Sequence, residues 1–98
     1  MSESGESPAK VHALAEIVNK RGLHARASAK FVETAARFPC EVSVAKDGTA
    51  VSGRSIMGLM MLGAGQGSII ELSAKGAEAD AAMAALLALI RAKFHEDQ

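Results

Sequence analysis

Two side chains near the start of the chain are suited to phosphate chemistry: His24 and Arg26, in the stretch "NKRGLHARASAKF" at positions 19–31. Imidazole has an ordinary pKa of about 6.5, so a histidine ring offers a nucleophilic nitrogen near neutral pH. A guanidinium group presents a fork of N–H donors that matches the oxygens of a phosphate. The pair could therefore accept a phosphoryl group or bind an anion without covalent chemistry.

The helix that must position these side chains is predicted over residues 25–37. Its apolar stripe follows a helical spacing, and Pro39 disfavours the helical conformation at Phe38, which sets the end. His24 would then precede the first turn, where unpaired backbone N–H groups attract anions. A histidine that merely lies at a helix boundary is the alternative, because spacing alone does not separate it from a phosphorylated one.

A second segment, "GRSIMGLMMLGAGQG" at positions 53–67, predicts a short apolar helix over residues 54–62 with Ser55 as its N-cap. Helical spacing cannot bury all of its large side chains, so the segment is either core or a docking surface for partners. Ser55 could also accept a phosphoryl group, which would change the charge of that surface. The loop "GAGQG" lacks the Lys and Ser or Thr of a phosphate-binding P-loop.

Composition excludes several other classes of protein. The 98 residues suffice for one domain, and 11 basic residues balance 11 acidic ones, which argues against nucleic acid as a partner. One cysteine and three scattered histidines predict no disulfide, metal site or cofactor. No pair of carboxylates stands near His24, and no Ser or Cys is placed to act with it as a nucleophile. The sequence therefore does not predict a hydrolase. No secretory signal or membrane span is recognisable, which predicts a cytoplasmic protein without a membrane partner.

The order of the predicted elements is β-α-β-β-α-β-α. Strands are expected near residues 11–18, 40–46, 49–53 and 68–74, and the last helix over 78–94. The turn "DG" at 47–48 predicts a hairpin, so the sheet is at least partly antiparallel. One apolar stripe on each helix predicts an α+β sandwich with one open sheet face. Residues 1–9 are expected to form a disordered tail, and 10–98 a single domain.

Two motifs in the right order, "GLHARASAKFV" and "RSIMGLMMLGAGQGSIIELSAKG", resemble the HPr family of histidine-containing phosphocarriers of the bacterial phosphotransferase system. The resemblance covers nearly the whole chain from Val11. The stretches "EIVNKRGLHAR" and "LALIRAKFHED" look more like the nitrogen-related NPr branch. The implied fold is an open-faced β-sandwich, in which three helices cover one face of a four-stranded antiparallel sheet.

The resemblance also implies specific roles. Nδ1 of His24 would take a phosphoryl group from enzyme I, charged by phosphoenolpyruvate, and pass it to a IIA-type acceptor. Arg26 would stabilise the phosphate, and Ser55 would match the serine modified by HPr kinase/phosphorylase. Such a carrier is a substrate of other enzymes, not an enzyme itself, and is expected to be a monomer. The predicted docking residues are Ala27, Ile56, Met57, Met60 and Met61.

Ala27 departs from the family, which usually has proline at this position. Proline fixes the backbone of the first helical turn and lacks an N–H group. Alanine adopts the same conformation and adds one N–H near the phosphate, so function is expected to survive.

Two other functions stay open. The chain could be a regulatory module whose phosphorylation at His24 or Ser55 controls docking without onward transfer. It could also be a domain that binds a metal or a small anion.

Overall fold

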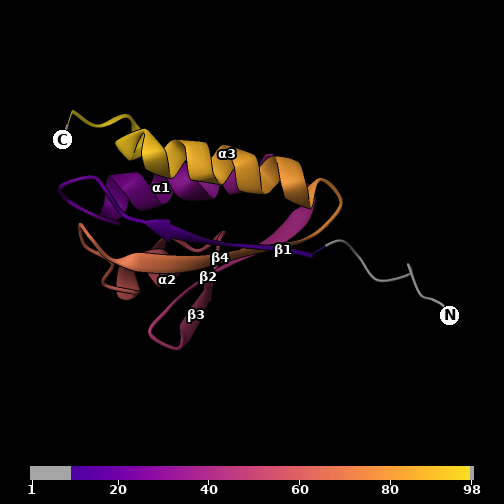
Figure 1. Ribbon diagram of the computed structural model, residues 1–98, viewed down its shortest axis with the longest axis horizontal. Helices are drawn as coiled ribbons and strands as arrows, with labels where there is room; N and C mark the ends of the chain where they lie inside the picture. Colours follow the sequence, from indigo (N-terminus) through magenta and orange to yellow (C-terminus); the bar gives the residue numbers. More distant parts are fainter. Residues whose placement is uncertain (1–9, 98) are drawn as a thin grey trace, which may run out of the picture.

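Residues 10–97 are described by a computed structural model that contains four strands and three α-helices (Figure 1). The predicted disordered tail, residues 1–9, lies outside the described residues. None of the helices formed by residues 10–97 has the length and apolar character needed to cross a bilayer. The observed order confirms the predicted one: β1 (Lys10–Glu16), α1 (Ala25–Ala35), β2 (Cys40–Lys46), β3 (Thr49–Ser52), α2 (Ile56–Met61), β4 (Ile69–Gly76), α3 (Ala79–Arg91) and a short 3-10 turn, η2 (Lys93–His95).

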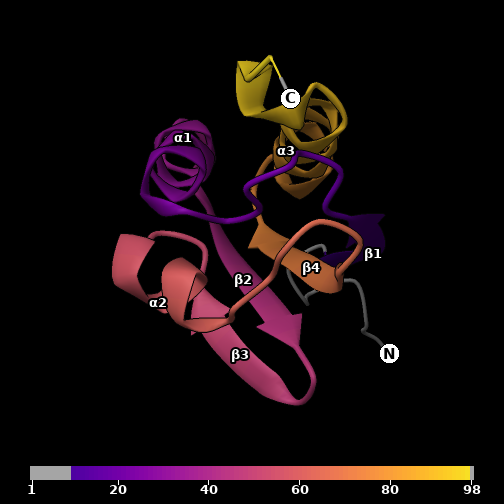
Figure 2. The ribbon, with the colours of Figure 1, turned by 90° about the vertical axis from the view of Figure 1, so that its left-hand side faces the viewer.

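The four strands form one sheet in the order β1-β4-β2-β3, and every neighbouring pair is antiparallel. The tight turn at Asp47 and Gly48 joins β2 to β3 as the sequence predicts, with positive φ at both residues. Helices α1 and α3 lie side by side over the sheet, and α2 lies next to α1 (Figure 2). The predicted α+β architecture, with three helices on one face of an antiparallel sheet, is confirmed.

The core lies between the helices and the sheet. Alternate residues of β4, Ile70, Leu72 and Ala74, point inward and are buried, as the period of two in a strand requires. No helix formed by the described residues covers the opposite face of the sheet, where Leu14 and Ile69 are 71% and 52% exposed. The helices contribute their apolar stripes to the core: Ala27, Phe31 and Ala35 from α1, and Ala82, Met83, Leu86 and Ile90 from α3.

The C-terminal end of α3 differs from the prediction of a helix to residue 94. The helix ends at Arg91, and Lys93, Phe94 and His95 have left-handed backbones with φ of 57°, 56° and 61°. Phe94 is still fully buried, because the left-handed turn inserts its ring into the core. The helical periodicity of the sequence therefore predicts correctly that Phe94 belongs to the core. It predicts a helical backbone at Phe94 incorrectly, because the backbone there is left-handed. The turn directs the end of the chain toward the start of α1.

Candidate functional site

His24 is the N-cap of α1, with an extended backbone at φ −75° and ψ −178°. Its carbonyl accepts the first helical hydrogen bond, from the Ser28 N–H at 2.9 Å, while its ring makes no capping bond. The N–H groups of Ala25, Arg26 and Ala27 precede that bond and have no carbonyl within the helix to donate to. The predicted helix start is thus confirmed, and its donors lie beside the histidine.

The loop before His24 rests on the glycine-rich segment after α2. The Leu23 N–H donates to the Ala64 carbonyl at 2.9 Å, and the Gly67 N–H donates to the Ile17 carbonyl at 2.7 Å. Gly22 has φ of +65°, and a Cβ atom there would lie 2.4 Å from the Ala64 oxygen. The "GAGQG" segment is therefore a backbone support for the loop that carries His24.

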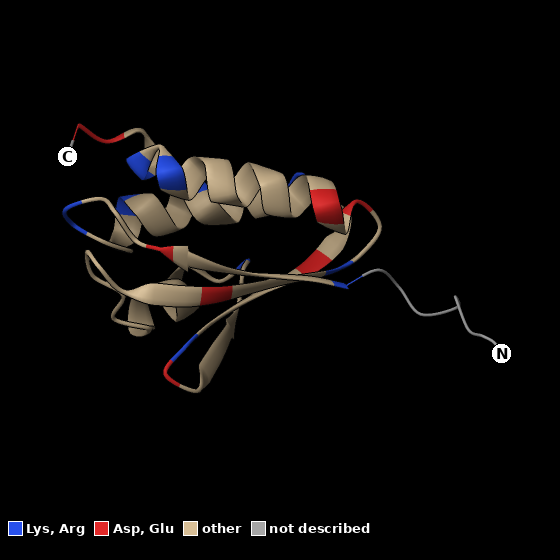
Figure 3. Ribbon diagram, in the orientation of Figure 1, with Lys and Arg blue, Asp and Glu red and all other residues tan. Residues whose placement is uncertain are grey.

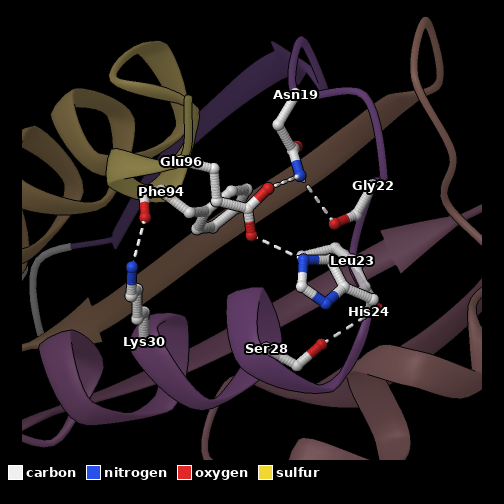
Figure 4. Close-up of polar contacts among 8 residues, drawn as sticks. All are labelled: Asn19, Gly22, Leu23, His24, Ser28, Lys30, Phe94 and Glu96. Carbon is white, nitrogen blue, oxygen red and sulfur yellow. Dashed lines mark hydrogen bonds and ion pairs between the residues drawn. The ribbon is translucent and has the colours of Figure 1, made fainter. Parts of the chain in front are cut away.

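The His24 ring contacts a carboxylate from the far end of the chain (Figure 4). Nε2 of His24 lies 2.5 Å from Oε2 of Glu96, and the two side chains are only 18% and 13% exposed. An ionised carboxylate can only accept, so the proton of this bond belongs to Nε2. In the neutral ring, the second nitrogen, Nδ1, then carries the lone pair.

Asn19 holds the other oxygen of the same carboxylate. Its Nδ2 donates to Glu96 Oε1 at 3.0 Å and to the Gly22 carbonyl at 2.9 Å (Figure 4). Both partners are acceptors, which fixes the orientation of the amide. Asn19 is fully buried, so this contact ties Glu96 to the loop that precedes His24.

The ionisation of Glu96 follows from these contacts. Burial raises the pKa of the Glu96 carboxyl, but hydrogen bonds from His24 and Asn19 and the positive charges of His24 and Lys30 outweigh that effect. The pKa of Glu96 therefore lies below its ordinary value of 4.5. The group is a carboxylate at neutral pH.

Basic side chains surround the histidine. An open hollow of about 350 Å³ is lined by seven residues from the loop, α1 and the C-terminal turn. Lys and Arg gather at this end of the molecule, where α1 begins and α3 ends (Figure 3). Arg26 is exposed and lines the hollow together with His24, as the sequence predicts. The complete lining is Arg21, His24, Arg26, Lys30, His95, Glu96 and Asp97.

The hollow suits an anion better than a metal ion. Within residues 10–97, no three His, Cys, Asp or Glu side chains come together in a cluster that could hold a metal. The hollow instead brings two guanidinium groups, from Arg21 and Arg26, and the ammonium group of Lys30 to the helix start at His24, beside the carboxylates of Glu96 and Asp97. Guanidinium and ammonium groups at a helix start are donors suited to a phosphate.

Two features of the site are absent from the sequence reading. The expectation that no pair of carboxylates lies near His24 is wrong, because Glu96 contacts the ring and Asp97 lines the same hollow. Glu96 is 72 residues away, and only the unpredicted left-handed turn brings it there. Asn19 is also missing from the residues that the sequence predicts for the site. The available signal is an asparagine at the first position of a turn, which the Gly22 N–H closes by donating to the Asn19 carbonyl at 3.2 Å.

The Ser55 side chain caps α2 as predicted. Its Oγ accepts a hydrogen bond from the Gly58 N–H at 2.9 Å. Gly58 permits this approach, because a Cβ atom there would lie 3.0 Å from the same oxygen. Glycine is unfavourable inside a helix, but at position 58 it makes room for the Ser55 cap.

The apolar side chains of α2 divide between core and surface. Leu59 is fully buried, while Ile56, Met57, Met60 and Met61 are 40%, 69%, 41% and 79% exposed. These four exposed residues, named here the α2 patch, therefore do not belong to the core.

Ala27, which the sequence places on the docking surface, is different. It is fully buried, because it belongs to the inward stripe of α1, so its side chain is not part of any surface.

Comparison with known proteins agrees with this geometry. A family model described as "PTS HPr component phosphorylation site" matches residues 11–92. The chain belongs to the HPr family. Members of the HPr family are phosphocarrier proteins of the phosphotransferase system.

Relatives within the HPr family match most of the chain. The phosphocarrier protein HPr of Neisseria meningitidis serogroup A is 54% identical over 83 residues, which cover 85% of this chain and 93% of that protein. The phosphocarrier protein NPr of Shewanella violacea is 45% identical over 80 residues, which cover 82% and 88%.

A solved structure, HPr-C-His from Thermoanaerobacter tengcongensis, superimposes with a TM-score of 0.86 at 45% identity, covering 90% of this chain and 99% of that one. The likeness confirms the predicted HPr-like sandwich.

Proposed function

We propose that this HPr-family chain accepts a phosphoryl group on Nδ1 of His24 from the phosphohistidine of enzyme I and passes it to a IIA-type acceptor. The observation that carries the proposal is the contact between Nε2 of His24 and Glu96 at an uncapped helix start. In the neutral ring this contact favours a proton on Nε2 and leaves the free electron pair on Nδ1. The carrier acts as a monomer, because one small site must face two partners in turn.

The proposed transfer is a substitution at phosphorus. The Nδ1 lone pair of His24 attacks the phosphorus atom while the bond from phosphorus to the donor's nitrogen breaks, and the donor nitrogen keeps that electron pair. The Nε2 proton stays in place between the ring and Glu96. In the transfer to the acceptor, a nucleophile of the acceptor attacks the phosphorus atom while the bond from phosphorus to Nδ1 of His24 breaks, and Nδ1 keeps that electron pair. Such transfers have loose transition states, so position and charge decide the rate.

The residues around His24 supply position and charge. Arg26 lines the hollow and can donate two hydrogen bonds to the phosphoryl oxygens. The first-turn N–H groups of α1 add uncharged donors, including that of Ala27, which a proline would remove. Lys30 is held at the hollow by its bond from Nζ to the Phe94 carbonyl, at 2.6 Å.

The α2 patch is the proposed docking surface for both partners. Its exposed methionine side chains are flexible and can adapt to more than one protein surface. Ser55 lies at the first turn of α2 and is the proposed target of an HPr kinase/phosphorylase. A phosphate there would add about two negative charges beside the patch and so would weaken docking.

Labelled phosphoenolpyruvate with purified enzyme I tests the proposal. We expect label on this chain, and loss of that label when a IIA-type acceptor is added. Acceptors of the sugar branch and of the nitrogen branch, tried in parallel, assign the branch. Label that stays on the chain with every acceptor would contradict onward transfer and favour a regulatory module. No label at all would contradict the phosphocarrier function.

A further inference from the structure

We infer that Glu96 is a positioning residue that keeps the proton of His24 on Nε2 and so makes Nδ1 the atom that receives the phosphoryl group. The inference rests on the phosphocarrier function proposed above and assigns a role to the C-terminal turn. Three observations carry it: the contact with the ring, the support of the carboxylate, and the turn that delivers it.

The contact is specific for one nitrogen. Oε2 of Glu96 lies 2.5 Å from Nε2 of His24, and a carboxylate stabilises the ring form that has a proton at this atom. The other tautomer would place two lone pairs against each other at this distance. In the neutral ring, Nδ1 is thereby left as the unprotonated atom, which is the requirement for attack on phosphorus.

The carboxylate itself is held in place. Asn19 donates to Oε1 at 3.0 Å, so each oxygen of Glu96 has one partner. The Asn19 side chain is fully buried and is anchored by its second bond to the Gly22 carbonyl. A ring whose partner is itself fixed by a buried group has a defined orientation, as in other relays of three side chains.

The turn that delivers Glu96 is anchored on both sides. Each left-handed residue other than glycine is disfavoured, and three such residues follow each other at positions 93–95. The burial of Phe94 and the bond from Lys30 Nζ to the Phe94 carbonyl hold this backbone in place. Strained backbone that is over-determined by its surroundings is typical of functional sites.

Glu96 also favours the phosphorylated state. When Nδ1 forms its bond to phosphorus and Nε2 keeps its proton, the ring gains positive charge. The carboxylate lies next to that charge, while the phosphoryl group is attached to the other nitrogen, on the far side of the ring. Loss of the carboxylate should therefore slow phosphorylation by enzyme I about tenfold or more.

The test is the tautomer of His24 in the unphosphorylated protein, read from long-range ¹⁵N–¹H correlations of the ring at pH 8. We compare the natural protein with Glu96→Gln, which keeps the shape of the side chain. Glu33→Gln, the same change at an exposed position of α1, is the control. We expect the Nε2–H pattern in the natural protein and in the control, and a mixture of both tautomers in Glu96→Gln.

An unchanged Nε2–H pattern in Glu96→Gln, or a natural protein without that pattern, would overturn the inference. This readout requires no phosphorylation, so it is separate from a failure of the proposed function. The same three proteins are then incubated with phosphoenolpyruvate and enzyme I. A rate loss in Glu96→Gln alone supports the inference, and equal rates in all three proteins contradict it.

Discussion

His24 differs from an ordinary histidine at a helix boundary in what surrounds its ring. An ordinary N-cap side chain bonds to the first-turn N–H groups, whereas this ring leaves them free and bonds to Glu96 instead. The arrangement combines an oriented nucleophile with unused donors. Both are needed for a phosphoryl group that must be accepted and then released.

Arg26→Gln tests the stabilisation of the phosphate. The guanidinium is exposed, so we expect the free energy of unfolding to stay within about 0.5 kcal/mol of the natural value. Hydrogen bonds to a charged group contribute about 1.5–3 kcal/mol, so the rate of phosphorylation should fall about 10- to 100-fold. Stopped-flow or quench-flow phosphorylation by enzyme I measures it.

Arg37→Gln is the matched control, because this arginine is also exposed but lies just beyond the other end of α1. Equal phosphorylation rates for the two variants would show that Arg26 does not stabilise the phosphoryl group.

The lowered pKa of Glu96 predicts a pH-dependent contribution to stability. A carboxyl group with a lower pKa in the folded than in the unfolded state stabilises the fold above its ordinary pKa, here 4.5, and loses this effect as pH falls through the folded value. The natural protein should therefore unfold at a higher denaturant concentration than Glu96→Gln at pH 7, and the difference should shrink below pH 4.5. A difference that is equal at pH 7 and pH 3 would refute this assignment.

At the scale of elements, the loop before α1 and the segment after α2 act as one unit. Hydrogen bonds from Leu23 to Ala64 and from Gly67 to Ile17 connect them, so the position of His24 depends on residues 40 and more positions later. Gly22 lies at the closest approach of the two segments.

Gly22→Ala should destabilise the fold by about 3 kcal/mol or more, because a methyl group there adds a backbone clash to the penalty of a left-handed alanine. Gly48→Ala is the control: its φ is also positive, at +85°, but a Cβ atom has nothing within 4 Å. We expect it to lose only about 1–2 kcal/mol. Urea unfolding measures both, and an equal loss would contradict the role of the close contact.

The order of the strands and helices could be predicted from the sequence because its signals are local: periods of two and 3.6, the "DG" turn and the Ser55 cap. The fully antiparallel sheet is implied only by the family resemblance, and the strand order β1-β4-β2-β3 depends on pairing between distant segments that no local pattern encodes. The site could be predicted only in part. Glu96 reaches His24 through a left-handed turn of residues that rarely adopt it, and no local pattern encodes that contact. Ala27 is an error of the opposite kind: the sequence places it on the docking surface, but its side chain is buried. Its position in the motif does not reveal which way that side chain points.

Residues 10–97 present two exposed apolar surfaces, and only one of these is assigned to partners. Met57 and Met61 lie on α2, next to α1, whereas Leu14 and Ile69 lie on the open face of the sheet. The Met57→Gln, Met61→Gln double variant should raise the KM for enzyme I about tenfold or more, with stability unchanged within about 0.5 kcal/mol.

The control is the Leu14→Gln, Ile69→Gln double variant, which removes a similar exposed apolar area from the sheet and should leave KM unchanged. The reverse result, with the KM for enzyme I raised only in the Leu14→Gln, Ile69→Gln variant, would indicate that enzyme I docks on the open face of the sheet.

The site of phosphorylation tests the proposed phosphocarrier function most directly. The chain has three histidines, so His24→Ala, His12→Ala and His95→Ala are each incubated with labelled phosphoenolpyruvate and enzyme I. Circular dichroism checks that each variant is folded. We predict that only His24→Ala fails to take up label and that the label in the other two is acid-labile, as phosphohistidine is. Label that persists in folded His24→Ala would contradict phosphorylation at His24.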